Sequence, residues 1–153
     1  MARKVQFYFD VIRRRNLRKV KIDKKMHEKR IVVVDDDESI RKTFFLILHE
    51  NYRVYLAKDS REALQRFKNT DVDLIIADLK LPHLSGVEMV SEFRSAGYKG
   101  DVILISAFPD LIDIDELSRL SISHFFVKPL DLDALNRSID HLLNSEKNTE
   151  KRV

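Results

Sequence analysis

The fold is decided by residues 31–37, which read IVVVDDD. Four consecutive β-branched residues are typical of a short strand that is buried on both faces, as in a parallel sheet. Three carboxylates follow directly, at the point where such a strand would end. Together these features predict a buried strand that delivers acidic side chains to one edge of a sheet.

The same alternation continues along the chain. Apolar runs at 52–57, 74–77, 102–105 and 125–127 predict four more strands. Apolar residues at helical spacing predict a helix after each of the five strands, the fourth being a weaker and more polar stretch over 110–120. Strands and helices in strict alternation imply right-handed crossovers, so the fold class is α/β with a doubly wound parallel sheet.

Length and composition exclude several classes of protein. The chain has 153 residues, which suffice for one domain with a sizeable core. It has no Cys, which excludes disulfides, thiolate metal sites and a cysteine nucleophile. No apolar stretch approaches the roughly 20 residues that span a bilayer. We therefore expect a cytoplasmic globular protein with no transmembrane segment.

Charge is divided unevenly along the chain. Residues 1–30 carry 12 basic and 3 acidic residues, whereas residues 31–153 carry 16 basic and 22 acidic residues. The change in composition predicts a basic N-terminal extension over 1–28, a domain over 29–144 and a polar tail over 145–153. The extension would suit nucleic acid or an anionic surface, through residues 1–25 only. The alternative is that translation starts at Met26 and that the extension is not made.

The secondary structure of this extension is left open by its pattern. Its apolar residues fit one face of a helix or alternate positions of a strand, and the two sets are Val5, Tyr8, Phe9 and Ile12 for the helix and Val5, Phe7, Phe9 and Val11 for the strand.

Chemically reactive side chains follow four of the predicted strands. In doubly wound folds the ligand site lies outside the carboxyl ends of the strands. The residues at these ends are Asp35, Asp36 and Asp37, then Asp78, then Ser106, then Lys128. Clustered carboxylates repel one another unless a cation lies between them, and oxygen ligands without His or Cys suit magnesium (Mg²⁺). A carboxylate beside Mg²⁺ can attack phosphorus while a Lys and a hydroxyl bind the phosphoryl oxygens, so the set suits an aspartyl phosphate.

Each of these residues also has a simpler explanation. Acidic residues between a strand and a helix often complement the helix dipole. Asp78 could form a turn, Ser106 could cap a helix, and Lys128 could be a solvated side chain. The coincidence of all of them at four strand ends favours the chemical interpretation.

With these residues the chain resembles a receiver domain of two-component response regulators over about 29–144. The motifs that carry the resemblance are residues 33–41, 73–86, 104–107 and 126–130. The resemblance implies a flavodoxin-like (β/α)5 fold with strand order 2-1-3-4-5. Its partners would be a histidine kinase or histidine phosphotransfer protein and a downstream protein target.

The resemblance also assigns roles to individual residues. Asp78 would be the phosphoacceptor, and Mg²⁺ would be held by Asp78, by Asp35 and Asp36 directly or through water, and by the carbonyl of Lys80. Asp37 is the least suited of the three consecutive carboxylates. Ser106 would bind the phosphoryl group and Lys128 would pair with it.

A switch and a phosphoryl lifetime follow from the same resemblance. Ser106 would move toward the phosphoryl group while the aromatic residue Phe125 rotates inward, exposing a partner surface between the fourth helix and the fifth strand. Phe125 lacks the hydroxyl of a tyrosine, and the alternative is that it is ordinary core. Lys80 and Phe108 would flank the path of the hydrolytic water, and the bulk of Phe108 predicts a long-lived phosphoryl bond.

Two other functions compete with phosphotransfer. Phosphatases of the haloacid-dehalogenase type also use Asp, a hydroxyl, Lys and Mg²⁺, but they need a second carboxylate two residues after the nucleophile, where this chain has Lys80. We therefore expect a signalling phosphoacceptor rather than an enzyme. The other competitor is a pseudo-receiver that binds partners without being phosphorylated.

Overall fold

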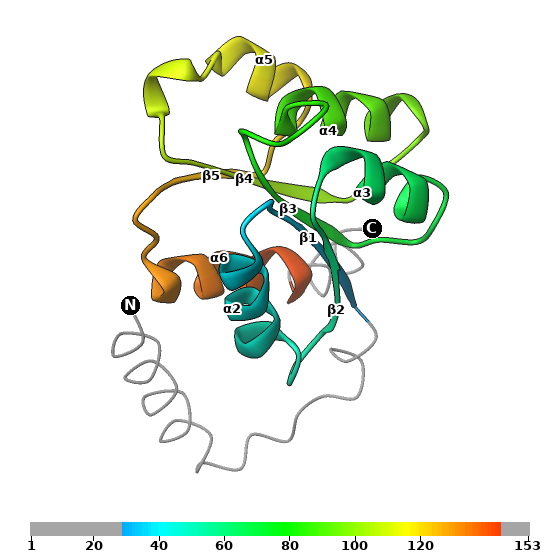
Figure 1. Ribbon diagram of the computed structural model, residues 1–153. Coiled ribbons are helices and arrows are strands. Elements are labelled where there is room, and N and C mark those ends of the chain that lie inside the picture. The colour runs from blue at the N-terminus through cyan, green and yellow to red at the C-terminus, as the bar shows by residue number, and fades with distance from the viewer. Residues whose placement is uncertain (1–28, 145–153) are drawn as a thin grey trace, which may run out of the picture.

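The computed structural model describes residues 29–144, so the expectations for the extension at 1–28 and the tail at 145–153 lie outside the described part of the chain. Within it, strands and helices alternate as predicted (Figure 1). In chain order the elements are β1 (Arg30–Val34), α2 (Glu38–Leu48), β2 (Arg53–Ala57), α3 (Ser60–Phe67), β3 (Leu74–Asp78), α4 (Gly86–Ser95), β4 (Asp101–Ser106), a 3₁₀ turn (Pro109–Leu111), α5 (Ile114–Arg119), β5 (His124–Val127) and α6 (Leu132–Asn144).

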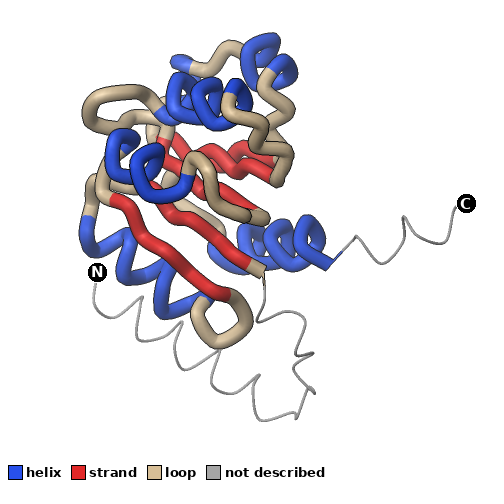
Figure 2. The backbone as a smooth tube through the Cα atoms, turned by 90° about the vertical axis from the view of Figure 1, so that its right-hand side faces the viewer, coloured by secondary structure: helices blue, strands red, loops and turns tan. Residues whose placement is uncertain are grey.

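The five strands form one parallel sheet in the order β2-β1-β3-β4-β5. Helices α3, α4 and α5 cover one face of this sheet, and α2 and α6 cover the other (Figure 1). The side view shows the strands between these two helical layers (Figure 2). The prediction of a doubly wound, flavodoxin-like α/β fold is confirmed.

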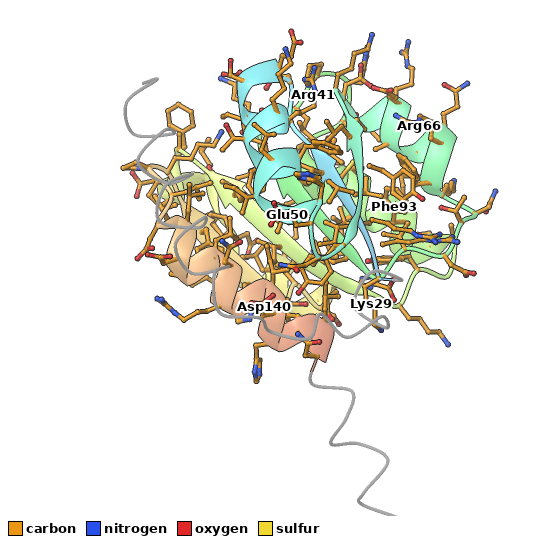
Figure 3. All side chains as sticks on the ribbon, turned by 90° about the horizontal axis from the view of Figure 1, so that it is seen from below. Lys29, Arg41, Glu50, Arg66, Phe93 and Asp140 are labelled. Atoms are coloured by element: carbon orange, nitrogen blue, oxygen red, sulfur yellow. The ribbon has the colours of Figure 1, made fainter. Side chains whose placement is uncertain are left out.

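Strand β1 explains why the sheet is buried on both sides. Its apolar residues are all inaccessible to solvent, and successive side chains point to opposite faces. Val32 and Val34 join the core beneath α3 and α4, while Ile31 and Val33 join the core beneath α2 and α6. Phe93 of α4, labelled in Figure 3, is among the largest side chains of the first core.

Short polar side chains start the helices at the carboxyl edge of the sheet. Asp37 accepts hydrogen bonds from the N–H groups of Ser39 and Ile40, and Asp59 accepts one from Glu62. Ser85 and Glu88 form a reciprocal capping box at the start of α4. These caps satisfy N–H groups that have no partner within their own helices.

The weak helical stretch over 110–120 is not one helix. It divides into the 3₁₀ turn and the short helix α5, separated by extended backbone at Ile112. The side chain of Asp113 accepts hydrogen bonds from the N–H groups of Asp115 and Glu116, so a new helix start is created inside the stretch. Leu111 and Ile114 are left about three-quarters exposed, 71% and 77%. This exposure accounts for the weak amphipathic pattern of the stretch.

Candidate functional site

Four predicted site residues meet at the carboxyl edge of the sheet. Asp78 and Ser106 are the last residues of the neighbouring strands β3 and β4, while Asp35 and Lys128 directly follow β1 and β5. Asp35, Asp78 and Ser106 are 3%, 9% and 1% exposed, which is unusual for polar side chains. The strand order places β1 beside β3, β3 beside β4 and β4 beside β5, so the sheet itself brings these groups together.

Lys128 links the two buried carboxylates. Its Nζ lies 2.6 Å from Asp78 Oδ2 and 3.6 Å from Asp35 Oδ2. The side chain of Lys128 is 24% exposed. It is therefore an ion-pair partner at the site and not a solvated surface lysine.

The other oxygen of each carboxylate is held by the backbone. Asp35 Oδ1 accepts a hydrogen bond from the Asp37 N–H at 2.9 Å, and Asp78 Oδ1 accepts one from the Lys80 N–H at 3.0 Å. The carbonyl of Asp35 accepts a further bond from the guanidinium of Arg41 at 2.8 Å, from the α2 side of the site (Figure 3). Each carboxylate is thus oriented so that its Oδ2 faces Lys128.

Burial changes the protonation of this group of side chains. Desolvation raises the pKa of Asp35 to about 6, although the bond from the Asp37 N–H and the charge of Lys128 act in the opposite direction. For Lys128, burial alone would lower the pKa, but the hydrogen bond to Asp78 and the attraction of Asp35 outweigh it and hold the pKa above its usual value. A cation that enters beside Asp35 therefore competes with an ammonium group and with a proton.

Ser106 stabilises the local backbone and also keeps a hydroxyl proton that it can donate. Its Oγ accepts a hydrogen bond from the Phe108 N–H at 2.9 Å, a local turn contact, and the 3₁₀ turn that follows has no side-chain cap, so Ser106 is not a helix cap. Its carbonyl accepts a bond from the Lys128 N–H at 2.9 Å, which ties the ends of β4 and β5 together. A hydroxyl that accepts one hydrogen bond keeps its own proton for a second acceptor.

The three consecutive carboxylates at the end of β1 separate in the structure. Asp35 is buried in the site, Asp37 is exposed and caps α2, and Asp36 is exposed. Within residues 29–144, no three Asp, Glu, His or Cys side chains are arranged to hold a metal ion. A divalent ion here would rely on Asp35 and Asp78, the carbonyl of Lys80 and water. This donor set fits Mg²⁺, which is usually bound by one or two carboxylates and keeps several water ligands.

A hollow opens beside Ser106 between the loop after β3, the start of α4 and the segment before α5. Its volume is about 590 Å³. Lys80 and Phe108 both line it, and Lys80 Nζ lies 5.5 Å from the centre of the Phe108 ring, within the range of a cation–π contact. The two residues that sequence reasoning placed on either side of the water path therefore contact each other.

The role of Gly86 was missed by sequence reasoning, which used it only as part of a motif. Its N–H donates to the Leu79 carbonyl at 2.8 Å and closes the loop from 79 to 86. A Cβ at this position would lie 2.4 Å from the carbonyl oxygen of Asp78. Gly86 therefore allows α4 to start directly against the backbone of the candidate phosphoacceptor.

The side chain of Phe125 lies between the core and the surface of the domain. It pairs with Leu104 in the sheet and packs against the core beneath α3 and α4, yet it is only partly buried. None of the residues of β5 is fully buried, because β5 is an edge strand. Phe125 is therefore not ordinary fully buried core.

The fold and the site together define the receiver class of α/β domains. The family described as Response regulator receiver domain matches residues 31–140, and the chain belongs to this family. It is therefore a receiver domain of two-component phosphorelay signalling, a family of signalling phosphoacceptors rather than of catalytic enzymes. No helix within residues 29–144 is long and apolar enough to cross a membrane.

Individual relatives share much of the described domain. Sporulation initiation phosphotransferase F of Bacillus subtilis is 27% identical over 124 residues, which are 80% of this chain and 100% of that protein. Regulatory protein AtoC of Escherichia coli is 29% identical over 117 residues, which are 74% of this chain but only 25% of AtoC. The chain thus spans about a quarter of that relative, whose whole-protein activity does not transfer with the similarity.

Solved structures show the same fold. Response regulator protein TrrA from Thermotoga maritima, determined in complex with Mg²⁺-BeF, is 32% identical with a TM-score of 0.66, over 75% of this chain and 99% of that chain. A CheY-like receiver domain protein from Methanospirillum hungatei is 26% identical with a TM-score of 0.72, over 78% of this chain and 96% of that chain.

Proposed function

We propose that Asp78 accepts a phosphoryl group from a histidine kinase or a histidine phosphotransfer protein in the cytoplasm. The observation that carries this proposal is the position of Lys128 Nζ between the buried carboxylates of Asp78 and Asp35. Two carboxylates, an ammonium group and the buried hydroxyl of Ser106 at one sheet edge are the groups that phosphoryl transfer to a carboxylate needs.

In this mechanism Oδ2 of Asp78 attacks phosphorus, and the bond from phosphorus to the donor nitrogen breaks. The Lys80 N–H holds Oδ1 and keeps the carboxylate oriented during the attack. Lys128 then moves its contact from the carboxylate to a phosphoryl oxygen, and the Ser106 hydroxyl donates to another. A bound Mg²⁺ would supply countercharge for the remaining phosphoryl oxygens. Its ligands would be Asp35, Asp78 and the carbonyl of Lys80, with Asp36 acting through water.

The phosphoryl group would then switch a partner surface. It adds roughly −1.5 to −2 charges and three strong acceptors beside Ser106. We infer that Ser106 moves toward it, that Phe125 turns into the space released, and that the surface between α5 and β5 changes for a downstream protein. The partial burial of Phe125 supports this role, because a fully packed ring would have no room to turn.

Intact-protein mass spectrometry after incubation with acetyl phosphate tests the proposal. A phosphate adduct should form with Mg²⁺ present and should be absent without Mg²⁺ and in Asp78→Asn. Asp71→Asn is the matched control, because Asp71 is exposed and precedes β3 at the opposite edge of the sheet. Absence of the adduct in the folded wild-type protein would refute phosphotransfer and favour a pseudo-receiver that only binds partners.

A further inference from the structure

The side chain of Ser60 hydrogen-bonds the loop that carries Lys80 to the start of α3. Ser60 is the first residue of α3 and has no exposed surface. Its Oγ donates a hydrogen bond to the Pro82 carbonyl at 2.9 Å and accepts one from the Leu84 N–H at 2.9 Å. One buried hydroxyl thus binds the loop at two points that lie two and four residues beyond Lys80.

The conformation held by these two bonds is not one that the loop favours by itself. His83, which lies between the two bonded residues, has a φ of +72°, in the left-handed region that costs energy for a residue with a Cβ. Its Nε2 lies 3.8 Å from Asp59 Oδ2, and His83 is exposed, so this charge contact contributes little. The two hydrogen bonds of Ser60 therefore attach this part of the loop to α3 at Pro82 and Leu84.

The loop is otherwise held close to the site itself. The Gly86 N–H bonds the Leu79 carbonyl at its base, and the Lys80 N–H bonds Asp78 Oδ1. The orientation of the Lys80 carbonyl thus depends on attachments on both sides of it. Pro82 is exposed, so without Ser60 its carbonyl would bond water and the loop would relax without unfolding the domain.

We propose that Ser60 is a positioning residue for the metal site: its hydroxyl holds the loop over 79–85 in the conformation in which the Lys80 carbonyl would serve as a ligand. This inference rests on the proposed function, since it concerns the affinity of the same site for Mg²⁺. Residues that orient metal ligands typically change metal affinity about 10-fold or more when they are removed. Ser60→Ala should therefore weaken Mg²⁺ binding by about 10-fold.

Ser123→Ala is the matched control. The Ser123 hydroxyl also makes one bond of each kind, donating to Asp101 Oδ1 at 2.8 Å and accepting from the Val102 N–H at 3.2 Å. It lies just before β5, at the edge of the sheet opposite the site. Loss of a hydroxyl with two hydrogen bonds would as such affect both variants, whereas loss of loop positioning would affect only Ser60→Ala.

The experiment measures Mg²⁺ affinity by calorimetry and backbone hydrogen exchange in metal-free protein. Ser60→Ala should show about 10-fold weaker Mg²⁺ binding and faster exchange of the Leu84 N–H, while Ser123→Ala should retain wild-type values for both. If Ser60→Ala does not fold, Ser60→Cys, which fills similar space with a weaker donor, takes its place in the same comparison.

Wild-type Mg²⁺ affinity in a folded Ser60 variant would overturn the inference, whether or not the Leu84 N–H exchanges faster. Failure of the wild-type protein to bind Mg²⁺ would instead refute the proposed function. The two failures are therefore distinguishable.

Discussion

Replacement of Phe108 tests how long the phosphoryl group would last. Phe108 is half exposed, its N–H bonds Ser106 Oγ, and its ring lies beneath the ammonium group of Lys80. Both side chains line the hollow beside Ser106, through which a hydrolytic water would approach. Phe108→Asn removes the ring, the cation–π contact and the apolar barrier together.

The expected magnitude follows from the Lys80 to Phe108 contact. A cation–π contact at an exposed site contributes about 0.5–1 kcal/mol. If water enters only when the side chains of Lys80 and Phe108 separate, loss of their contact raises the fraction of molecules with separated side chains about 2- to 5-fold. The phosphoryl bond should therefore hydrolyse about 2- to 5-fold faster in Phe108→Asn than in wild type, and faster still where the lost bulk also admits water.

The assay follows the loss of the phosphate adduct by intact-protein mass spectrometry after removal of acetyl phosphate. Phe108→Leu serves as a control, because it keeps an apolar side chain of moderate size but has no ring for Lys80. It should fall between wild type and Phe108→Asn. Loss of phosphate from Phe108→Asn at or below the wild-type rate would refute the reasoning.

Three further predictions concern stability. Gly86→Ala should lower the free energy of unfolding by about 1–3 kcal/mol in denaturant titration, because its Cβ would lie 2.4 Å from the Asp78 carbonyl oxygen; Gly97→Ala, where no atom lies within 4 Å of the added Cβ, should lose only what its positive φ costs. Burial and the hydrogen bond to Asp140 raise the pKa of Tyr52 above the ordinary value of 10.0. As the pH rises, Tyr52 therefore ionises in the unfolded chain before it ionises in the folded protein. The stability that this difference contributes is complete below about pH 10 and falls as the pH rises further. The free energy of unfolding of Tyr52→Phe should decline less steeply above about pH 10 than that of wild type, and equal slopes would contradict this prediction. In thermal melting, Mg²⁺ should stabilise Lys128→Met more than wild type, because the ion would be the main countercharge left for Asp35 and Asp78; equal stabilisation would argue against a shared binding place.

Much of this fold follows from local pattern, and the reason is visible in β1. Residues 31–34 are apolar without interruption because both sheet faces are covered, and the acidic residues follow at the point where the strand ends. The same logic located Asp78, Ser106 and Lys128, since parallel topology brings strand ends together whatever the intervening helices contain.

Local sequence pattern does not predict contacts between segments that are distant in the chain. The bonds of Ser60 to Pro82 and Leu84 join residues 22 and 24 positions apart. The close approach of α4 to the Asp78 carbonyl depends on a packing distance that the sequence expresses only as a glycine. The separate roles of Asp35, Asp36 and Asp37 likewise depend on where the chain turns after β1.

The site combines fixed and exchangeable contacts, and this division bears on its chemistry. Both Oδ1 atoms are bonded to backbone N–H groups two residues ahead, so the orientation of Asp35 and Asp78 does not depend on what occupies the site. Both Oδ2 atoms face Lys128, whose flexible side chain can move while remaining charged. In the proposed function, a phosphoryl group and a divalent ion would therefore replace the ammonium contact without disturbing the backbone of the carboxylates. On this reasoning, the free-energy cost of binding an ion or a phosphoryl group arises from moving the Lys128 side chain and the loop that Ser60 holds.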